Sequence, residues 1–514
     1  MIVPARREVG VFAAIILIAL VMRIWTIDYD LPYVIHPDEP AVIGVSLQVL
    51  KSGDLNPHFF HYPSLVFYVH ALGYTLYYAF GRLAGIMSTP LDLADLSSIV
   101  LGTTLAPDPT IVMLSRAISL LLGVGSVAIV YLIGRSLTKR WEVGAIAALF
   151  LAISPTHIYH SRIVTPDVFI TFFALCTVFF SVLIFHEGKS WQYVAAGIAV
   201  GFTAGSKYNG ALVGLVIVVA HFLRTGWAGW KDPRVYLTLP LAAVTFLITT
   251  PYAVLDYPAF LEALAFDTSH YATGHSGMEG NTVRWYLGFL WSTTNIVSLL
   301  AAFQIIRGVI TRSKPTLLLA SYPVIYFIFI SRFIVRNDRT FLPILPLVFL
   351  LAAIPLVDLG HLWRLARDTR TRAIVAACFI FVAAIILVPP ARASIGNNLQ
   401  RNQTHIKALA SEWIEDNIPP GSRIAIESYG PYVDPDTYGI TPFNQIIDNP
   451  PHWYGEQGFK YLILSQGLYG RYFREPDRYT DEVSRYQEFF DTFELVKALA
   501  SDATEIRIYQ VNNQ

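Results

Sequence analysis

Charged residues are scarce in this chain. They make up 14% of its 514 residues, whereas hydrophobic residues make up 54%. Ordinary soluble domains carry about 25% charged residues. This deficit, together with repeated apolar runs of about 18 residues or more, indicates a polytopic membrane protein. The chain also lacks a basic stripe, which argues against nucleic acid as a partner.

Cysteine is almost absent. The two cysteines, Cys176 and Cys378, each lie inside an apolar run and are most simply small core residues. No disulfide framework is available, so cysteine usage does not indicate the compartment. At the N-terminus, Arg6 and Arg7 precede an apolar run that no small-x-small cleavage site follows. We therefore expect an uncleaved first transmembrane helix.

The positive charges between the apolar runs predict the topology, because Lys and Arg collect in cytoplasmic loops. The positive loops all fall on one side if the tyrosine-rich run at 63–84 does not cross but lies in or on the outer leaflet. The alternative is that this run crosses and a weaker run elsewhere does not. We predict about 11 transmembrane helices, a multi-pass protein of the cell membrane, a cytoplasmic N-terminus and an extracytoplasmic C-terminal domain. The apolar runs lie near 9–26, 63–84, 110–137, 143–160, 167–186, 191–206, 208–223, 235–253, 283–306, 316–331, 340–358 and 373–390.

The last part of the chain has a different character. Residues 1–390 hold 26 Lys and Arg against 20 Asp and Glu, and residues 391–514 hold 11 against 17. We therefore predict a transmembrane domain at 1–390 and a soluble α/β domain at 391–514. In the second domain the pattern predicts a helix at 404–417, strands at "SRIAIE", "KYLILS" and "EIRIYQV", and a helix at 481–491. The fold class is thus mainly α, a polytopic helical membrane protein with a small C-terminal α/β domain.

With this topology, the unusual polar residues gather on the outer side. Any one of the acids is more simply a helix cap than a catalyst. Ionisable groups at membrane depth are costly, however, and their convergence on one side predicts a site. The residues concerned include His36, Asp38 and Glu39 in the first outer loop, Arg162 and Asp167 in the second, Lys207 in the third, His270 and His275 in the fourth, and Arg336 and Arg339 in the fifth.

The residue types indicate a ligand that is both anionic and hydrophobic. Lys207, Arg336 and Arg339 are suited to clamp a phosphate, and the apolar scaffold is suited to hold a lipid tail. Carboxylates can deprotonate an incoming hydroxyl. A polyprenyl-phosphate sugar combines a phosphate, a tail and a transferable group, but composition and spacing alone do not name the reaction.

Four segments resemble, in order, the membrane glycosyltransferases of the GT-C superfamily, and in particular the group of protein O-mannosyltransferases and lipid A aminoarabinose transferases. They read "HPDEPAVIG…NPHFFHYPSLVFYVHAL", "YHSRIVTPDVFITFFAL", "GSKYNGALVGL" and "RTFLPILPLVFLLAA". The resemblance spans roughly residues 9–360. It implies a mannosyltransferase-like enzyme that takes a sugar from a polyprenyl-phosphate donor, with inversion, and gives it to an acceptor hydroxyl of a lipid, glycan or protein on the extracytoplasmic face.

The resemblance also assigns roles to the three acids. Asp38 matches the catalytic acid of the first loop and is the expected base, and Glu39 is the adjacent acid of the same motif. Asp167 matches the acid of the second loop, which supports the reaction or positions the acceptor. Lys207 and either Arg336 or Arg339 match basic residues that face the donor phosphate. His36, Tyr62, Arg162, His270 and His275 are further candidates for the cavity.

Some features leave alternatives open. The chain has no β-trefoil insert like that of eukaryotic O-mannosyltransferases, which weakens the case for a protein acceptor. The histidines leave a divalent metal open, but we predict no metal ligands because no pair of them has a helical ligand spacing. A transporter or flippase of a lipid-linked or anionic solute is the second hypothesis, although charges at one face and the lack of repeated halves argue against it. A membrane scaffold whose tail binds a partner is the third.

Overall fold

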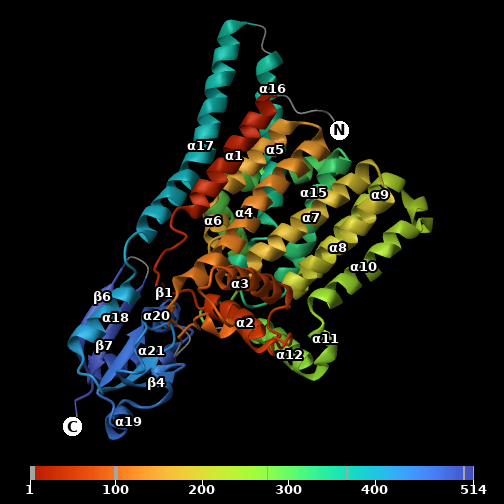
Figure 1. The fold of residues 1–514 in the computed structure, drawn as a ribbon. Coiled ribbons are helices and arrows are strands. Elements are labelled where there is room, and N and C mark those ends of the chain that lie inside the picture. Colours follow the sequence, from red (N-terminus) through yellow and green to blue (C-terminus); the bar gives the residue numbers. More distant parts are fainter. Residues whose placement is uncertain (1–5, 98–101, 275, 366–367, 502–503, 513–514) are drawn as a thin grey trace.

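A computed structural model describes residues 6–97, 102–274, 276–365, 368–501 and 504–512. It divides into a helical bundle and a sheet-containing C-terminal domain, which the long helix α17 joins (Figure 1). The bundle and its loops contain α1 (Arg6–Ile24), β1 (Tyr33–Val34), α2 (Glu39–Ser52), α3 (Leu65–Leu83), η1 (Pro90–Asp92), β2 (Thr104–Leu105), α4 (Pro109–Thr138), α5 (Trp141–Ala152), α6 (Pro155–His160), α7 (Pro166–His186), α8 (Ser190–Ser206), η2 (Tyr208–Gly214), α9 (Leu215–Thr225), η3 (Trp227–Lys231), α10 (Pro233–Thr249), α11 (Tyr252–Leu255), α12 (Tyr257–Thr273), α13 (Thr282–Thr294), α14 (Ile296–Ile310), α15 (Lys314–Ile330), η4 (Arg339–Phe341), α16 (Leu345–Leu365) and α17 (Thr369–Arg401).

Proline determines where several of these helices begin. Pro109, Pro155, Pro166 and Pro233 each occupy the first helical position of α4, α6, α7 and α10. Proline suits this position because its fixed φ is already helical and its missing N–H has no intrahelical partner there. The apolar faces of α4, α5, α7, α8, α14 and α16 pack on one another to form the main core of the bundle.

Two predicted apolar runs are broken helices rather than straight ones. The run at 283–306 bends by 115° between α13 and α14. The bend lies at Asn295, which has a φ of 46° and so interrupts the regular helix. The run at 143–160 divides into α5 and α6, because Ser154 and Pro155 start a new helix there. Each of these two apolar runs therefore forms two helices, and the sequence did not predict the breaks.

Four helical segments of the described residues are long and apolar enough to cross a membrane, and the bent pair α13–α14 adds a fifth if it is one span. Shorter apolar helices, among them α5, α10, α15 and α16, pack beside them. The number of 11 crossings stays a prediction. The helix α3, which covers the run at 63–84, lies with α2 across the end of the bundle (Figure 1). That orientation agrees with the expectation of a segment that does not cross.

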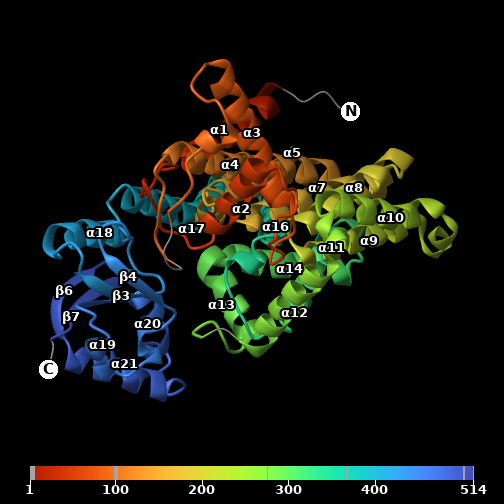
Figure 2. The same ribbon diagram turned by 60° about the horizontal axis from the view of Figure 1, so that its bottom comes forward.

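The C-terminal domain is a three-layer α/β structure. Its sheet has the strand order β4-β3-β5-β7-β6, with β4, β3 and β5 parallel and β7 antiparallel to both β5 and β6. One face is covered by α18 and the other by α19, α20 and α21 (Figure 2). The elements are α18 (Ile406–Asn417), β3 (Arg423–Glu427), β4 (Gly439–Phe443), η5 (Ile446–Asp448), α19 (Pro451–Glu456), β5 (Tyr461–Ser465), α20 (Gln466–Phe473), α21 (Thr480–Thr492), β6 (Glu494–Ala500) and β7 (Glu505–Gln510). Both predicted helices and all three predicted strands are present.

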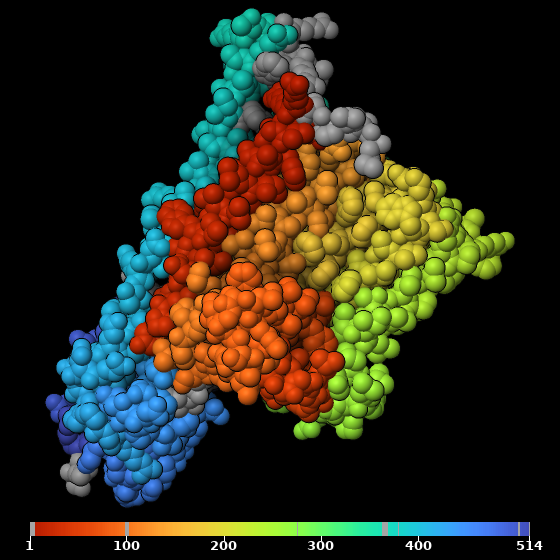
Figure 3. All heavy atoms as spheres, in the orientation of Figure 1, coloured from red at the N-terminus to blue at the C-terminus, as the bar shows by residue number. Residues whose placement is uncertain are grey.

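The C-terminal domain rests against the loops at one end of the bundle (Figure 3). The backbone N–H and the hydroxyl of Thr103 both donate to the carbonyl of Gly430, at 3.3 and 3.0 Å. On the other side, Arg336 donates to Glu475 at 3.2 Å and Arg478 pairs with Glu279. The helix α17 continues through residue 390 to Arg401, so the first element of the sheet domain is α18.

Candidate functional site

The end of the bundle beside the C-terminal domain gathers charged side chains from four elements. Asp38 directly precedes α2, Asp167 lies in the first turn of α7, Lys207 separates α8 from η2, and Arg339 begins η4. Prolines at 40 and 166 fix the starts of α2 and α7, so both acids lie at helix N-termini. Partial positive charge at such ends favours carboxylates. We call Asp38, Asp167, Lys207 and Arg339 the four-charge cluster.

In the first ion pair of the cluster, Nη1 of Arg339 donates to Oδ2 of Asp38. Both side chains are partly exposed, at 28% for Arg339 and 22% for Asp38. Asp338 holds Arg339 in place by accepting from its backbone N–H at 2.8 Å. The pair is therefore partly accessible from outside the protein.

In the second ion pair, Nζ of Lys207 donates to Oδ1 of Asp167 at 2.9 Å. The other carboxylate oxygen of Asp167, Oδ2, is buried and has no hydrogen-bond partner among the described residues. Asp167 also interacts electrostatically with Arg339 and His160, which connects the two pairs. A buried acceptor without a donor is costly, so this oxygen indicates a place for a hydroxyl or another donor.

Glu39 lies beside Asp38 in the sequence but in a separate, closed ion pair. It is fully buried, and Arg116 donates to its two oxygens from Nε at 3.0 Å and from Nη2 at 2.9 Å. The backbone N–H of Val164 adds a third donor at 3.1 Å. Arg116 also donates to the carbonyls of Ile27 and Tyr29, so it fastens the first loop to α4. The structure therefore does not bring Glu39 into the four-charge cluster.

Two of the predicted arginines also lie outside the cluster. Arg162 is buried, and its Nη1 donates to the carbonyl of Trp25, to Thr26 and to Asn398. Arg336 faces the C-terminal domain, where Glu475 accepts from it. Of the two arginines between which the sequence left the choice open, only Arg339 pairs with an acid of the cluster.

Two further predicted residues border the cluster. Burial, together with the nearby carboxylate of Asp38, raises the pKa of Tyr62, so its hydroxyl remains a proton donor. His36 accepts from the backbone N–H of Asp38 at 3.2 Å, and burial lowers the pKa of its imidazole. Both side chains are thus neutral hydrogen-bonding groups next to Asp38.

The remaining histidine candidates are less informative. His270 lies on α12, where its ring stacks on Phe266 with centroids 6.0 Å apart. His275 lies outside the described residues. No group of three or more His, Cys, Asp and Glu side chains that could hold a metal ion occurs in the part of the chain that the structure describes.

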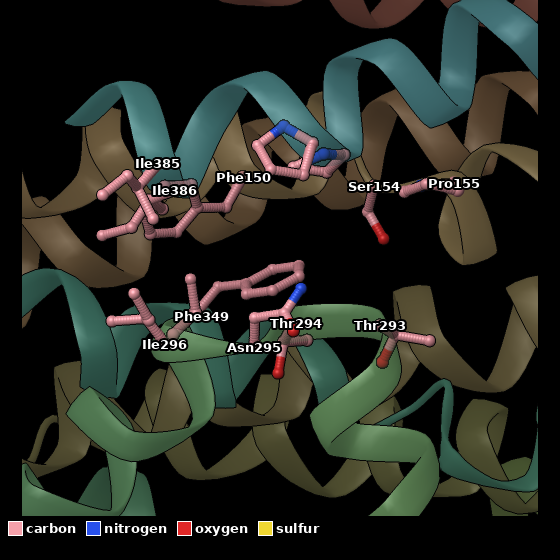
Figure 4. A pocket seen from close by; sticks show the side chains of 13 residues that line it. Phe150, Ser154, Pro155, Thr293, Thr294, Asn295, Ile296, Phe349, Ile385 and Ile386 are labelled. Atoms are coloured by element: carbon pink, nitrogen blue, oxygen red, sulfur yellow. The ribbon is translucent and has the colours of Figure 1, made fainter. Parts of the chain in front are cut away.

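An apolar pocket lies between the α5–α6 junction, α14 and α17. Phe150, Phe349, Ile385 and other apolar side chains line it, and Ser154 and Asn295 lie at its polar end (Figure 4). Ser154 caps α6, and His160 at the far end of α6 pairs with Asp338 at 3.4 Å. The short helix α6 therefore connects the pocket to the segment that carries Arg339.

Comparisons with known proteins bear on this arrangement. The family model of dolichyl-phosphate-mannose-protein mannosyltransferase matches residues 94–267, about a third of the chain. No curated protein matches. Among solved structures, ArnT from Cupriavidus metallidurans bound to undecaprenyl phosphate is similar at 16% identity and a TM-score of 0.55, over 98% of each chain. The chain has the GT-C fold.

A second group of solved GT-C structures agrees with this conclusion. The oligosaccharyltransferase AglB from Archaeoglobus fulgidus, in complex with an inhibitory peptide and a dolichol-phosphate, has a TM-score of 0.54 at 12% identity. That match covers 89% of this chain and 69% of AglB. The predicted fold class and the predicted resemblance are thereby confirmed: this is a helical membrane protein with the GT-C fold and a C-terminal α/β domain.

Sequence reasoning missed two residues that contact the predicted site residues. Arg116, the partner of Glu39, is a cation deep inside the apolar run at 110–137, whose other cation, Arg135, lies near the end of the run. This isolated charge was the signal that could have found it. Tyr271 interacts electrostatically with Tyr62, Lys207 and Arg339. No signal in the sequence separates Tyr271 from the many other tyrosines.

Proposed function

We propose that this GT-C protein is a glycosyltransferase that moves a sugar from a polyprenyl-phosphate donor to an acceptor hydroxyl, with inversion at the anomeric carbon. The observation that carries the proposal is the four-charge cluster, in which two cations and two acids meet at one end of an apolar bundle. The similar ArnT structure is bound to undecaprenyl phosphate, and AglB is in complex with a dolichol-phosphate. A lipid phosphate is therefore the ligand class that we assign to the cations.

Lys207 and Arg339 are the proposed phosphate ligands. Each now neutralises one acid of the cluster. A phosphate that binds between them competes with both carboxylates, because each cation can then direct its donors to phosphate oxygens. Donor binding would in this way release Asp38 and Asp167 from their ion pairs at the moment when they are needed.

Asp38 is the proposed general base. It accepts the proton of the acceptor hydroxyl while the acceptor oxygen bonds to the anomeric carbon and the bond from that carbon to the phosphate oxygen breaks. Polyprenyl phosphate leaves with the negative charge, which Lys207 and Arg339 stabilise. The unpartnered oxygen of Asp167 is placed to accept a hydrogen bond from a sugar or acceptor hydroxyl.

The remaining predicted residues have supporting roles in this proposal. Glu39 and Arg162 hold the first loop against α4, α17 and the second loop. Tyr62 donates a hydrogen bond in the cavity. The charge pattern of the loops supports a cytoplasmic N-terminus and an extracytoplasmic position for the cluster and the C-terminal domain.

The test is the Asp38→Asn variant of the full chain in lipid nanodiscs. We expect transfer from a polyprenyl-phosphate sugar to fall by about 10²–10⁴-fold, the usual contribution of a general base. Donor binding should persist, because Lys207 and Arg339 remain. The matched control is Asp54→Asn, an exposed acid whose partner is His58. Unchanged transfer by a folded Asp38→Asn protein would refute the role of Asp38.

A further inference from the structure

The helix α13 lies beside the segment of Arg336 and Arg339 and presents three distinct faces. Tyr286 is 1% exposed and its ring lies 6.0 Å from that of Phe341, which places this face against the bundle. Val283, Leu287 and Trp291 form an apolar face that is 42%, 53% and 50% exposed. The sharp bend to α14 turns α13 away from the axis of that bundle helix. An amphipathic helix of this kind suits the membrane interface.

The third face of α13 borders a groove. Its lining consists of Asn281, Arg284, Trp285, Gly288, Phe289, Ser292 and Arg336. A side chain at Gly288 would meet no atom within 4 Å, so the middle of the groove is open. The rings of Trp285 and Phe289 stack with centroids 5.5 Å apart and form an aromatic floor.

Two arginines, Arg284 and Arg336, line this groove. Arg284 is exposed, and no carboxylate of the described residues forms an ion pair with it. Arg336 is held firmly: Glu475 accepts from its guanidinium, its backbone N–H donates to Met278, and Gly280 packs against it so closely that a Cβ there would lie 2.9 Å from Nη1. The groove thus has one fixed and one available cation, and α13 has no acidic residue.

We propose that this groove binds the phosphate headgroup of an anionic membrane lipid. Arg284 and Arg336 are the donors for the phosphate, and the stacked rings of Trp285 and Phe289 contact the upper part of the acyl chains. The exposed apolar face next to the groove argues for a lipid rather than a free phosphate, because it places the groove where the headgroups of the surrounding bilayer lie. The site is separate from the four-charge cluster and does not depend on the transfer reaction.

The test uses the full chain in phosphatidylcholine nanodiscs that contain a minor fraction of a diazirine-bearing phosphatidylglycerol. We expect this probe to label the peptide that spans 282–294. Arg284→Gln should lower the labelling about fivefold, the effect of one basic residue near an anionic membrane surface. Gly288→Leu should lower it similarly, because the leucine fills the open middle of the groove without a clash.

Two matched variants serve as controls. Arg82→Gln removes another exposed arginine, near the end of α3, and Gly396→Leu fills an equally open glycine position on α17. Both should label like the wild type, and thermal unfolding should be the same for all four variants. Equal labelling by a diazirine-bearing phosphatidylcholine, or labelling that survives Arg284→Gln, would overturn the proposal. Loss of labelling in millimolar inorganic phosphate at matched ionic strength would assign the groove to free phosphate instead.

Discussion

Asp38 and Glu39 are adjacent in the sequence and each pairs with an arginine, yet they belong to two regions of the molecule that differ in burial. Glu39 lies in a sealed pocket, where three donors from Arg116 and Val164 use both of its oxygens. Asp38 lies in a partly open cluster, where both it and its partner Arg339 remain partly exposed. The comparison teaches that a carboxylate's place in a motif does not determine whether it is available for binding. The number and the accessibility of its hydrogen-bond partners determine this.

The same criterion distinguishes the other buried acids. Asp167 has one cation and one unused oxygen, so part of its hydrogen-bonding capacity is still available. Glu427 in the C-terminal domain has no cation among its hydrogen-bond partners and relies on two backbone N–H groups and the hydroxyl of Tyr486. Glu39, Asp167 and Glu427 therefore differ: both oxygens of Glu39 accept hydrogen bonds from Arg116, one oxygen of Asp167 is unused, and burial raises the pKa of Glu427.

The largest expected effect on stability comes from breaking the buried pair of Glu39 with Arg116. Glu39→Gln keeps the shape of the side chain but leaves the buried Arg116 without an anion, which should cost about 3–5 kcal/mol of stability. The shift of the thermal unfolding midpoint in detergent is the measurement. The double variant Glu39→Gln/Arg116→Met should recover part of the loss, since it removes the uncompensated charge. A fully stable single variant would contradict the structural role of Glu39.

The next largest effect concerns the pair of Lys207 with Asp167 in the four-charge cluster. Lys207→Gln keeps a donor near Asp167 but removes the charge that we assign to the leaving phosphate, so transfer should fall by about 10²–10³-fold. The variant should also bind donor more weakly, which a titration of donor against nanodisc-embedded protein measures. Lys189→Gln is the matched control, because Lys189 pairs with the exposed Glu187 at the opposite end of α8. Normal donor affinity in Lys207→Gln would separate Lys207 from the phosphate.

The sequence was sufficient to predict which segments of the chain carry the cluster. It was not sufficient to predict which of the adjacent acids, Asp38 or Glu39, belongs to it. Asp38, Asp167, Lys207 and Arg339 were all candidates, and the structure brings them together. Glu39 could not be separated from Asp38, because its partner Arg116 is 77 residues away along the chain and only the packing of α2 on α4 brings them into contact.

In the C-terminal domain, too, local sequence patterns predicted some strands and missed others. The strands β3, β5 and β7 have dense runs of Ile and Leu and were predicted, whereas β4 contains a proline and β6 contains residues that favour helices. Both missed strands lie at the edges of the sheet, where tertiary pairing outweighs weak local preference. The continuation of α17 through Pro389 and Pro390 was also not predicted, because proline alone suggests an end.

Glu427 offers a smaller, pH-dependent test of the same comparison. Burial raises the pKa of Glu427 from 4.5 to about 8 in the folded domain. Between these two values the unfolded chain has lost the proton and the folded domain has kept it, so stability falls as pH rises, by at most about 1.4 kcal/mol per pH unit. Glu427→Gln should flatten this dependence in thermal unfolding curves between about pH 5 and 8. An identical slope in the variant would show that another group titrates.

The smallest expected effect distinguishes Arg336 from Arg339. Arg336 pairs with Glu475 across the boundary between the two domains, and both side chains are partly exposed, at 19% and 35%. A partly exposed ion pair contributes about 0.2–1 kcal/mol, so Arg336→Gln should lower the melting temperature slightly and leave donor affinity unchanged. Arg339→Gln should instead weaken donor binding, because it removes the partner of Asp38 from the cluster. Measuring the donor affinity of both variants side by side decides the choice between Arg336 and Arg339 that the sequence left open. If Arg336→Gln alone weakened donor binding, the phosphate would lie on the side of the C-terminal domain and not between Lys207 and Arg339.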